Sequence, residues 1–321
     1  MTMTVLVTGA TGFIGSWVVR SLRRHGIETV LTDVRRDYSR LEMLVEDARS
    51  IPFVEADITQ PDTFERILRD YEVDRVIHLA ALLIPQCRAD PVMGGLVNVI
   101  GFLRLFEAVK KYGGVKNIVY ASSAAVYGPP TLYGPGPVGE RVILQPATHY
   151  GAFKVCNELT ANAYWVESRI PSIGLRPHTV YGFGRDVGVT ADVTRALKAA
   201  VLGRPFRIRF GGMIALQYVA DVAEAFVASS LAGLDGARVY NIRGEVVDMS
   251  MVVETIRKLV PGTENLITYD PTPLPLPADF DDTAFRQEIG PIQTTPVTEG
   301  LSETFQFFVR LKEEGRLYLE E

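Results

Sequence analysis

Three glycines spaced three residues apart follow a short apolar run near the start of the chain, and they limit the folds that it can adopt. The run at 5–7 is typical of a buried strand, and residues 16–25 carry apolar side chains at helical spacing. A strand, a glycine turn and a helix form the context of a dinucleotide-binding fingerprint. Gly9 permits the tight turn, Gly12 lets a pyrophosphate approach the helix N-terminus, and Gly15 lets the helix pack closely on the strand. A plain strand-to-helix turn is the alternative.

An acidic residue closes the second predicted strand. Asp33 ends the run at 28–33, 18 residues after Gly15. A carboxylate there can accept both hydroxyls of an adenine ribose and repels the additional phosphate of NADP, so Asp33 favours NAD. Arg35 and Arg36 follow closely and could accept that phosphate, which leaves NADP as a minority possibility.

Strand and helix patterns alternate through the first half of the chain, which predicts a parallel sheet with helices on both faces. We expect an α/β fold, a Rossmann-type doubly wound parallel sheet, with a smaller mixed C-terminal substrate-binding region. The NAD-binding domain should span 1–178, and 179–321 should form mainly the substrate-binding region, with a strand near 214–242 returning to the first domain. The expected elements are strands at 51–56, 74–79, 116–121, 206–210, 214–218 and 237–242, and helices at 61–70, 91–112, 191–202, 219–232, 249–259 and 297–312.

Residues at the ends of the strands are candidates for contacts with a dinucleotide. Asp57 and Ile58 could frame the adenine, although Asp57 could equally be a turn or cap residue. Asn98 lies inside a predicted helix, where Asn is disfavoured, so a cofactor-side or water-holding role is plausible. The fourth strand ends in residues that leave room for a cofactor, namely Leu79, Ala80 and Ala81.

A tyrosine and a lysine four residues apart suggest acid–base chemistry. Tyr150 and Lys154 would lie on one face of a helix, about 5.4 Å apart along its axis. A phenol with an unperturbed pKa of about 10 is a poor base near neutrality unless a neighbouring ammonium stabilises the phenolate. Lys154 is placed to do so, and Ser123 could hold a substrate oxygen. The alternative is a surface lysine above a half-buried tyrosine.

The composition of the chain argues against several classes of binding partner. With 33 basic and 38 acidic residues the net charge is −5, so no basic excess is available for nucleic acid or an anionic membrane. No apolar run reaches the roughly 18 residues that a membrane span needs. No signal peptide precedes the first strand, and Cys87 and Cys156 form no disulfide framework, so we expect a cytoplasmic protein. The four histidines lack metal-ligand spacing, so no metal site is expected.

At this point the chain resembles a known family, the extended short-chain dehydrogenase/reductases of the NAD-dependent epimerase/dehydratase group. The resemblance covers nearly the whole chain, and its motifs occur in the family's order. The matching pieces are 8–15, Asp33, 57–58, 79–81, 98–101, 122–128, 150–154, 176–182, 218–223 and 240–242.

The resemblance implies a set of site residues. Tyr150 would be the acid/base, Lys154 would lower its pKa and bind the nicotinamide ribose, and Ser123 would hydrogen-bond the reacting oxygen. Pro177 would contact the nicotinamide carboxamide through its backbone. Phe13 and Ile14, inside the glycine motif, would join the cofactor contacts. The family also commonly dimerises through helices corresponding to 91–112 and 148–168, which implies a homodimer.

The chain departs from family members that act on nucleotide sugars. Thr179 replaces their usual Asn, and neither 213–217 nor 271–282 carries the Arg expected to bind a diphosphate. Because a diphosphate without charged partners is poorly held, the substrate is expected to be a different small molecule. Further substrate candidates, each of which could instead be a packing or surface residue, are Ser122, His178, Thr179 and Arg185.

These features predict NAD-dependent hydride transfer at a secondary alcohol of a small polyhydroxy compound, sugar or hydroxy acid, with net oxidation. The second possibility is an epimerase that returns the hydride to the other face. A dehydratase is less favoured, because Ala124 and Ala125 stand where such enzymes keep an acidic pair. A non-catalytic dinucleotide sensor is the remote alternative. The presence of Ser, Tyr and Lys argues against it, because a sensor does not need an activated phenol.

Overall fold

The computed structural model describes residues 3–263 and 265–319, and its centre is a seven-stranded parallel sheet. This confirms the predicted Rossmann-type doubly wound fold. In spatial order the strands are β10 (Ala237–Asn241), β6 (Ser172–Arg176), β5 (Asn117–Ala121), β4 (Arg75–His78), β1 (Thr4–Thr8), β2 (Glu28–Asp33) and β3 (Phe53–Glu55).

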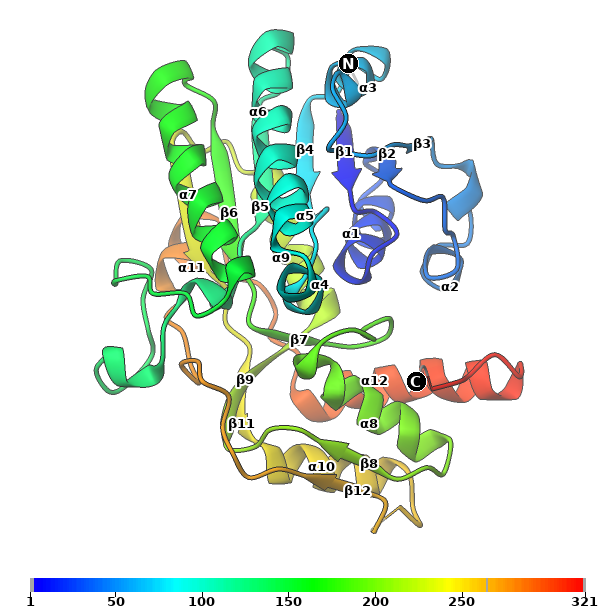
Figure 1. The fold of residues 1–321 in the computed structure, drawn as a ribbon. Helices are drawn as coiled ribbons and strands as arrows, with labels where there is room; N and C mark the ends of the chain where they lie inside the picture. Colours follow the sequence, from blue (N-terminus) through cyan, green and yellow to red (C-terminus); the bar gives the residue numbers. More distant parts are fainter. Residues whose placement is uncertain (1–2, 264, 320–321) are drawn as a thin grey trace.

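Helices cover both faces of this sheet (Figure 1). One face carries α3 (Thr63–Asp70), α6 (Gly101–Tyr112) and α7 (His149–Ser168), and the other carries α1 (Phe13–Arg24) and α9 (Val219–Leu231). Successive strand residues point to opposite faces, so β1 supplies Leu6 to the core on one side and Val5 and Val7 to the core on the other. Both faces are apolar because both are covered.

A smaller region lies below the sheet in Figure 1. It contains a sheet of β11 (Glu245–Asp248), β9 (Met213–Tyr218) and β7 (Thr179–Tyr181), and a two-stranded sheet of β12 (Ile267–Tyr269) and β8 (Phe206–Ile208). The helices of this region and beside it are α8 (Asp192–Val201), α10 (Met249–Leu259), α11 (Thr283–Glu288) and α12 (Val297–Glu313). The chain returns from β9 through α9 to β10, which joins the main sheet beside β6. The boundary near residue 178 stays a prediction.

The expected helix at 91–112 is built from three pieces in the structure. It consists of α5 (Pro91–Gly95), a π-helical turn (Leu96–Ile100) and α6, and it is preceded by α4 (Ile84–Ala89), which the sequence did not predict. The stretch Pro91–Tyr112 has the length and apolar composition of a membrane-spanning helix, but its inner side packs within the protein. Short elements outside the main sheet were also missed, such as α2 (Leu41–Leu44).

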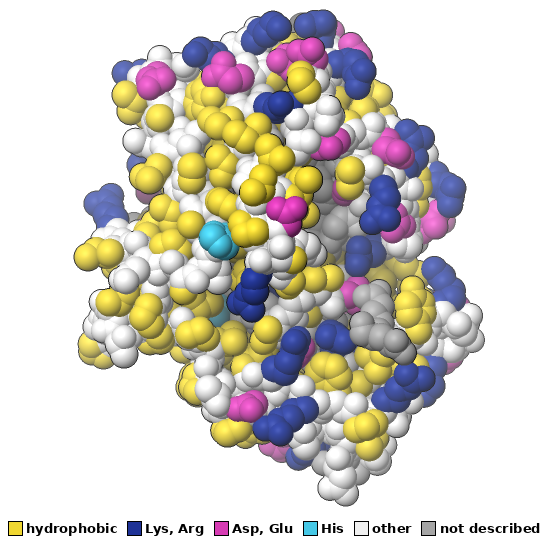
Figure 2. All heavy atoms as spheres, viewed as in Figure 1, with side chains coloured by type: hydrophobic (Ala, Val, Ile, Leu, Met, Phe, Trp, Pro, Cys, Tyr) yellow, Lys and Arg dark blue, Asp and Glu magenta, His cyan; other side chains and the backbone are white. Residues whose placement is uncertain are grey.

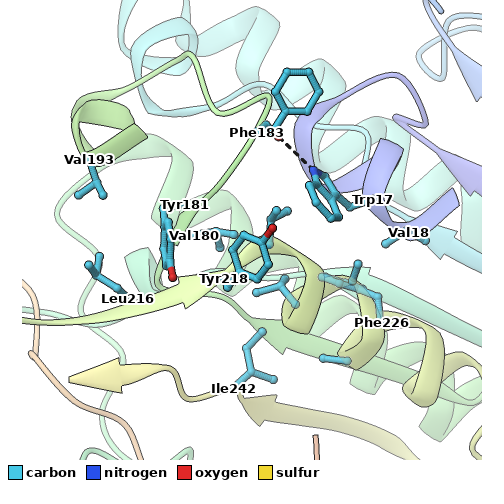
Figure 3. Close-up of a cluster of buried hydrophobic side chains, with 14 of the residues drawn as sticks. Trp17, Val18, Val180, Tyr181, Phe183, Val193, Leu216, Tyr218, Phe226 and Ile242 are labelled. Carbon is cyan, nitrogen blue, oxygen red and sulfur yellow. Dashed lines mark hydrogen bonds between the residues drawn. The ribbon is translucent and has the colours of Figure 1, made fainter. Parts of the chain in front are cut away.

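A cluster of aromatic side chains joins the two regions. Trp17 of α1 donates its indole N–H to the carbonyl oxygen of Phe183 at 3.0 Å and packs edge-on against Tyr218, with ring centres 5.8 Å apart (Figure 3). Both Trp17 and Tyr218 are almost completely buried. The loop that follows β7 is therefore fastened to the helix that follows the glycine turn.

Candidate active site

The glycine turn between β1 and α1 leaves no room for side chains. Gly9 has φ +65°, and a Cβ there would lie 2.7 Å from the Ala80 nitrogen. A Cβ on Gly15 would lie 2.1 Å from the Gly9 carbonyl oxygen. Glycine is thus required sterically at both positions.

The N-terminus of α1 fits a pyrophosphate. Gly12 is the N-cap, no side chain caps it, and the first turn of this fully described helix has no acidic residue. The N–H groups of the first turn, which include those of Phe13 and Ile14, therefore have no intrahelical partner and favour an anion. This is the chemistry that a dinucleotide requires, and these backbone groups would hold its phosphates.

Asp33 faces the glycine turn from the end of β2. One carboxylate oxygen accepts hydrogen bonds from the Thr11 hydroxyl at 2.7 Å and the Thr11 N–H at 3.1 Å, and the other accepts from the Val34 N–H at 2.8 Å. The oxygen that accepts from Val34 keeps acceptor capacity for a ribose hydroxyl, whereas the other oxygen already accepts two hydrogen bonds. Arg36 is turned away from this carboxylate, since its guanidinium donates to the Phe53 carbonyl oxygen at 2.9 Å.

The other residues expected to contact a dinucleotide make turn, packing and backbone contacts at the carboxyl edge of the sheet. Asp57 accepts from the Thr59 N–H at 2.8 Å, which is a turn interaction, and the buried Ile58 lies under Gly101. Asn98 lies in the π-helical turn, where it accepts from the Leu82 N–H at 2.8 Å and donates to the Leu82 carbonyl oxygen at 2.9 Å. It thereby ties down the segment that follows the partly exposed residues Leu79, Ala80 and Ala81.

Tyr150, Lys154 and Ser123 meet at the carboxyl edge of the sheet. Thr148 caps α7 by accepting from the Gly151 N–H at 3.0 Å, which fixes the first turn that carries Tyr150. The Ser123 hydroxyl lies just beyond β5, where it accepts from the Ala125 N–H at 3.1 Å and acts to lower the pKa of the Tyr150 phenol. Lys154 donates to the Ala121 carbonyl oxygen at 2.6 Å, and both Tyr150 and Lys154 are buried.

Burial and neighbouring charges set the protonation of this group. Burial raises the pKa of Tyr150 to about 12, while the Ser123 hydroxyl and the positive charge of Arg185 act in the opposite direction. Burial lowers the pKa of Lys154 to about 8. Lys154 lies beside the phenol, 5.4 Å from the centre of the Tyr150 ring, and its expected effect on the pKa of Tyr150 stays a prediction.

A buried ion pair behind the site was not predicted. Arg176 makes a two-pronged contact with Glu158, at 2.8 and 2.6 Å, and also donates to the Tyr127 hydroxyl at 2.7 Å. Ser122 donates to Glu158 at 2.5 Å, so its hydroxyl is engaged behind the strand end. The available signal was the spacing, because Glu158 follows Lys154 by one helical turn.

Three further candidates follow β6: Pro177 and His178 lie between β6 and β7, and Thr179 is the first residue of β7. The Pro177 carbonyl oxygen accepts from the Ala124 N–H at 2.9 Å. His178 bonds the Thr179 hydroxyl through Nδ1 at 3.0 Å and donates through Nε2 to the Pro277 carbonyl oxygen at 3.0 Å. Burial lowers the pKa of His178 to about 4, so this ring is neutral at physiological pH. His178 and Thr179 thus pack toward the proline-rich segment.

A cavity of ≈ 460 Å³ reaches Tyr150 from the side of α4 and the N-terminus of α7, with Ile84, Arg88 and His149 in its wall. This volume suits a small molecule. On the face shown in Figure 2, several Lys and Arg side chains lie near the level where the main sheet meets the smaller region. Within the described residues, no group of three His, Cys, Asp or Glu side chains is arranged to hold a metal ion.

Known proteins resemble this chain over most of its length. The model of the NAD dependent epimerase/dehydratase family matches residues 5–242. The chain is 31% identical over 315 residues to the UDP-glucose 4-epimerase of Mycolicibacterium smegmatis, a match that covers 95% of this chain and 98% of that protein.

Solved structures of this kind share the whole fold. The UDP-glucose 4-epimerase of Thermotoga maritima with UDP-glucose is 27% identical, with a TM-score of 0.85 and coverage of 97% of this chain and 100% of that one. The UDP-glucose 4-epimerase of Thermus thermophilus in complex with NAD is 26% identical, with a TM-score of 0.80 and coverage of 96% and 99%.

Proposed function

Since the chain belongs to the NAD-dependent epimerase/dehydratase family, we propose that it transfers hydride at a secondary alcohol with Ser123, Tyr150 and Lys154 as its catalytic groups. It is an NAD-dependent enzyme with a Rossmann fold. The observation that carries the proposal is that the buried Lys154 ammonium lies 5.4 Å from the centre of the buried Tyr150 ring, at the sheet edge that also holds Ser123 and the glycine turn.

Ser123, Tyr150 and Lys154, together with NAD, account for the proton and the hydride that leave the substrate alcohol. The substrate hydroxyl lies between Ser123 and Tyr150, and Tyr150 as phenolate takes its proton while the carbinol carbon loses hydride and becomes a carbonyl. NAD, when bound, accepts that hydride. Lys154 stabilises the phenolate and, through its remaining N–H donors, binds the nicotinamide ribose. The cofactor is oriented by the N–H groups of α1 and by Asp33.

The residues of the smaller region favour a small substrate that lacks a diphosphate. Strand β9 contains no Lys or Arg, and Ile214, Ala215 and Leu216 are buried in the apolar core. A diphosphate needs charge-assisted hydrogen bonds, each worth roughly 1.5–3 kcal/mol, and this strand supplies none of them. The ≈ 460 Å³ cavity that reaches Tyr150 has room for a polyhydroxy compound, sugar or hydroxy acid, and neither Ser123 nor Lys154 is among the residues that line it.

Epimerisation is the second candidate, and the 31% identity to a UDP-glucose 4-epimerase over 95% of the chain favours it. The same residues would then return the hydride to the opposite face of the keto intermediate. Dehydration is less favoured, because Ala124 and Ala125, beside Ser123, provide no acid or base. A sensor remains the remote alternative. We place the enzyme in the cytoplasm, where its free thiols Cys87 and Cys156 would stay reduced.

A single assay separates these outcomes. Purified protein is mixed with NAD and a panel of sugars, sugar acids and nucleotide sugars, and both the absorbance of reduced cofactor and the identity of the product are followed. Reduced cofactor that accumulates in proportion to product establishes a dehydrogenase. Product without accumulating reduced cofactor establishes an epimerase, and the absence of any turnover contradicts the proposal.

A further inference from the structure

Glu158 is a buried carboxylate that lies one helical turn beyond Lys154 on α7. One of its oxygens accepts from the Ser122 hydroxyl at 2.5 Å and from the Arg176 Nε at 2.8 Å. The other oxygen accepts from the Arg176 Nη2 at 2.6 Å. The carboxylate therefore joins α7 both to β6, which carries Arg176, and to the first residue beyond β5.

Two side chains of α7 hold successive residues at the end of β5. Lys154 donates to the Ala121 carbonyl oxygen at 2.6 Å, and Glu158, one turn later, holds the Ser122 hydroxyl. Ser123 is the next residue along the chain, so its distance from α7 is set by both contacts. The helix that carries the proposed acid/base thus also grips the strand end that presents the serine.

Arg176 fixes the orientation of the Glu158 carboxylate. Its guanidinium engages both carboxylate oxygens, and a two-pronged contact of this kind resists rotation. Its Nη1 donates to the Tyr127 hydroxyl at 2.7 Å, and that hydroxyl donates to the Asn241 side-chain oxygen at 2.6 Å. Arg176 ends β6 and Asn241 ends β10, so the network spans the carboxyl ends of neighbouring strands beside α7 (Figure 1).

A purely structural link between α7 and β6 is the alternative role for this ion pair. A buried ion pair is a weak source of stability, because the cost of removing two charges from water offsets much of their attraction. Apolar side chains of similar size would join the two elements as well. A structural link also does not need the third partner on the carboxylate, Ser122, which immediately precedes Ser123.

We propose that Glu158 is a positioning residue, which holds Ser123 against α7 so that the serine hydroxyl and the Tyr150 phenol face the same substrate oxygen. Glu158 acts through Ser122 and does not itself contact the substrate. A displacement of about 1 Å at a reacting group can cost about 100-fold in rate, so a fixed strand end matters for turnover. This inference rests on the proposed function and adds a residue behind its site.

The charge of Glu158 also has a measurable effect on Lys154. Burial lowers the pKa of Lys154 to about 8, and the Cys87 thiol on α4 and the Glu158 carboxylate act in the opposite direction. Other titratable groups near the ammonium are Tyr150 on α7 and His78 of β4, whose pKa burial lowers to about 3. Loss of the Glu158 charge should therefore lower the pKa of Lys154 further.

The test uses two variants that separate positioning from stability. Ser122→Ala removes the contact with Glu158 and leaves the ion pair in place. Glu158→Leu combined with Arg176→Met, called here the apolar-pair variant, replaces the ion pair by side chains of similar size, which is often neutral or stabilising for a fold. Glu167→Gln, at an exposed position of the same helix, is the control.

Four properties are measured for wild type and each variant. The pKa of Lys154 is taken from NMR of ¹³C-labelled lysine, with Lys154→Arg to assign its signal. Deuterium exchange is followed by mass spectrometry in the peptide that spans 121–127 and in the rest of the chain, with and without NAD. The thermal unfolding midpoint is recorded, and kcat, KM and NAD affinity are determined with sugars, sugar acids and nucleotide sugars.

We expect Ser122→Ala to lose roughly 10- to 100-fold in kcat, with KM, NAD affinity, the pKa of Lys154 and the unfolding midpoint close to wild type. Deuterium uptake should rise at 121–127 and stay unchanged elsewhere. The apolar-pair variant should show the same local increase and a similar loss of kcat without a lower unfolding midpoint. Its lower Lys154 pKa should also move the alkaline limit of turnover to lower pH. Glu167→Gln should behave as wild type.

Two results would overturn the inference. One is full kcat in Ser122→Ala or in the apolar-pair variant, and the other is exchange at 121–127 that stays as slow as in wild type or rises only together with the whole chain. If wild type turns over none of the compounds while exchange at 121–127 still depends on Ser122, the placement of Ser123 by Glu158 stands. That result would count against the proposed hydride transfer instead.

Discussion

The Lys154 ammonium lies 5.4 Å from the centre of the Tyr150 ring and donates to the Ala121 carbonyl oxygen at 2.6 Å. The two residues are four apart on α7, so the helix itself sets this geometry. With a pKa of about 8 for Lys154 and about 12 for Tyr150, the ligand-free site at pH 7 holds an ammonium and a neutral phenol. The proposed proton transfer to a Tyr150 phenolate would therefore need bound ligands that lower the pKa of Tyr150.

Asp33 should determine the preference for NAD over NADP. Its carboxylate would accept the ribose hydroxyls and repel the additional phosphate, so Asp33→Ser should weaken NAD binding by about tenfold and narrow the preference, because one charge-assisted interaction is lost. Dissociation constants for both cofactors measure this. Asp62→Asn, at an exposed position, is the control. An unchanged ratio of the two constants would exclude this role for Asp33.

Removing the charge of Glu158 should destabilise the fold. Glu158→Gln leaves the Arg176 guanidinium buried without its counter-charge, which costs about 3–5 kcal/mol in the free energy of unfolding. Urea denaturation measures the change. Glu254→Gln removes an exposed partner of Lys258 and should leave the transition where it is. Equal behaviour of the two variants would show that the buried pair contributes little.

Acid should destabilise the protein through His78. Burial lowers its pKa from 6.5 to about 3, so between these values the unfolded chain binds a proton that the folded chain does not. Stability is then fully present above pH 6.5 and is lost as the pH falls, by up to about 1.4 kcal/mol per pH unit. Unfolding free energies of His78→Gln should fall less steeply in this range, whereas the exposed His25→Gln should follow wild type. Parallel curves for all three proteins would refute the assignment.

The outer face of α5–α6 and α7 is expected to form a homodimer interface. Apolar side chains spread over these helices (Figure 2), and Leu159 and Val166 of α7 are 68% and 61% exposed. Light scattering of wild type should give twice the chain mass of 35.4 kDa, and Leu159→Glu with Val166→Glu should give a single chain. Ile143→Glu, on an exposed loop, is the control. A monomeric wild type would contradict the prediction.

Local patterns were sufficient for much of the fold. The alternation of strands and helices predicts a parallel sheet, which the structure contains. The spacing of Gly9 and Gly15 predicts the tight turn between β1 and α1, where the two residues approach closely. The pairing of Tyr150 with Lys154 follows from helical periodicity alone. These features depend on neighbours in sequence or on rules of chain connection.

Features that depend on contacts between residues far apart in the chain could not be predicted from local sequence patterns. The partner of Glu158 is Arg176 on another element, and Ser122, proposed as a substrate contact, instead donates to Glu158. The charge of Arg185 reaches Tyr150 only because the loop after β7 folds back over the glycine turn. The strands β8 and β12 are three residues each, too short for a periodic signal.

The most direct measurement compares turnover and NAD affinity in wild type and Tyr150→Phe, with Tyr112→Phe on α6 as the control. We expect Tyr150→Phe to lose roughly 10²- to 10⁴-fold in kcat while its NAD dissociation constant and unfolding midpoint stay close to wild type, because only the proton acceptor is removed. Tyr112→Phe should behave as wild type. Substantial turnover in Tyr150→Phe would contradict the assignment of Tyr150 as the acid/base and, with it, the proposed chemistry.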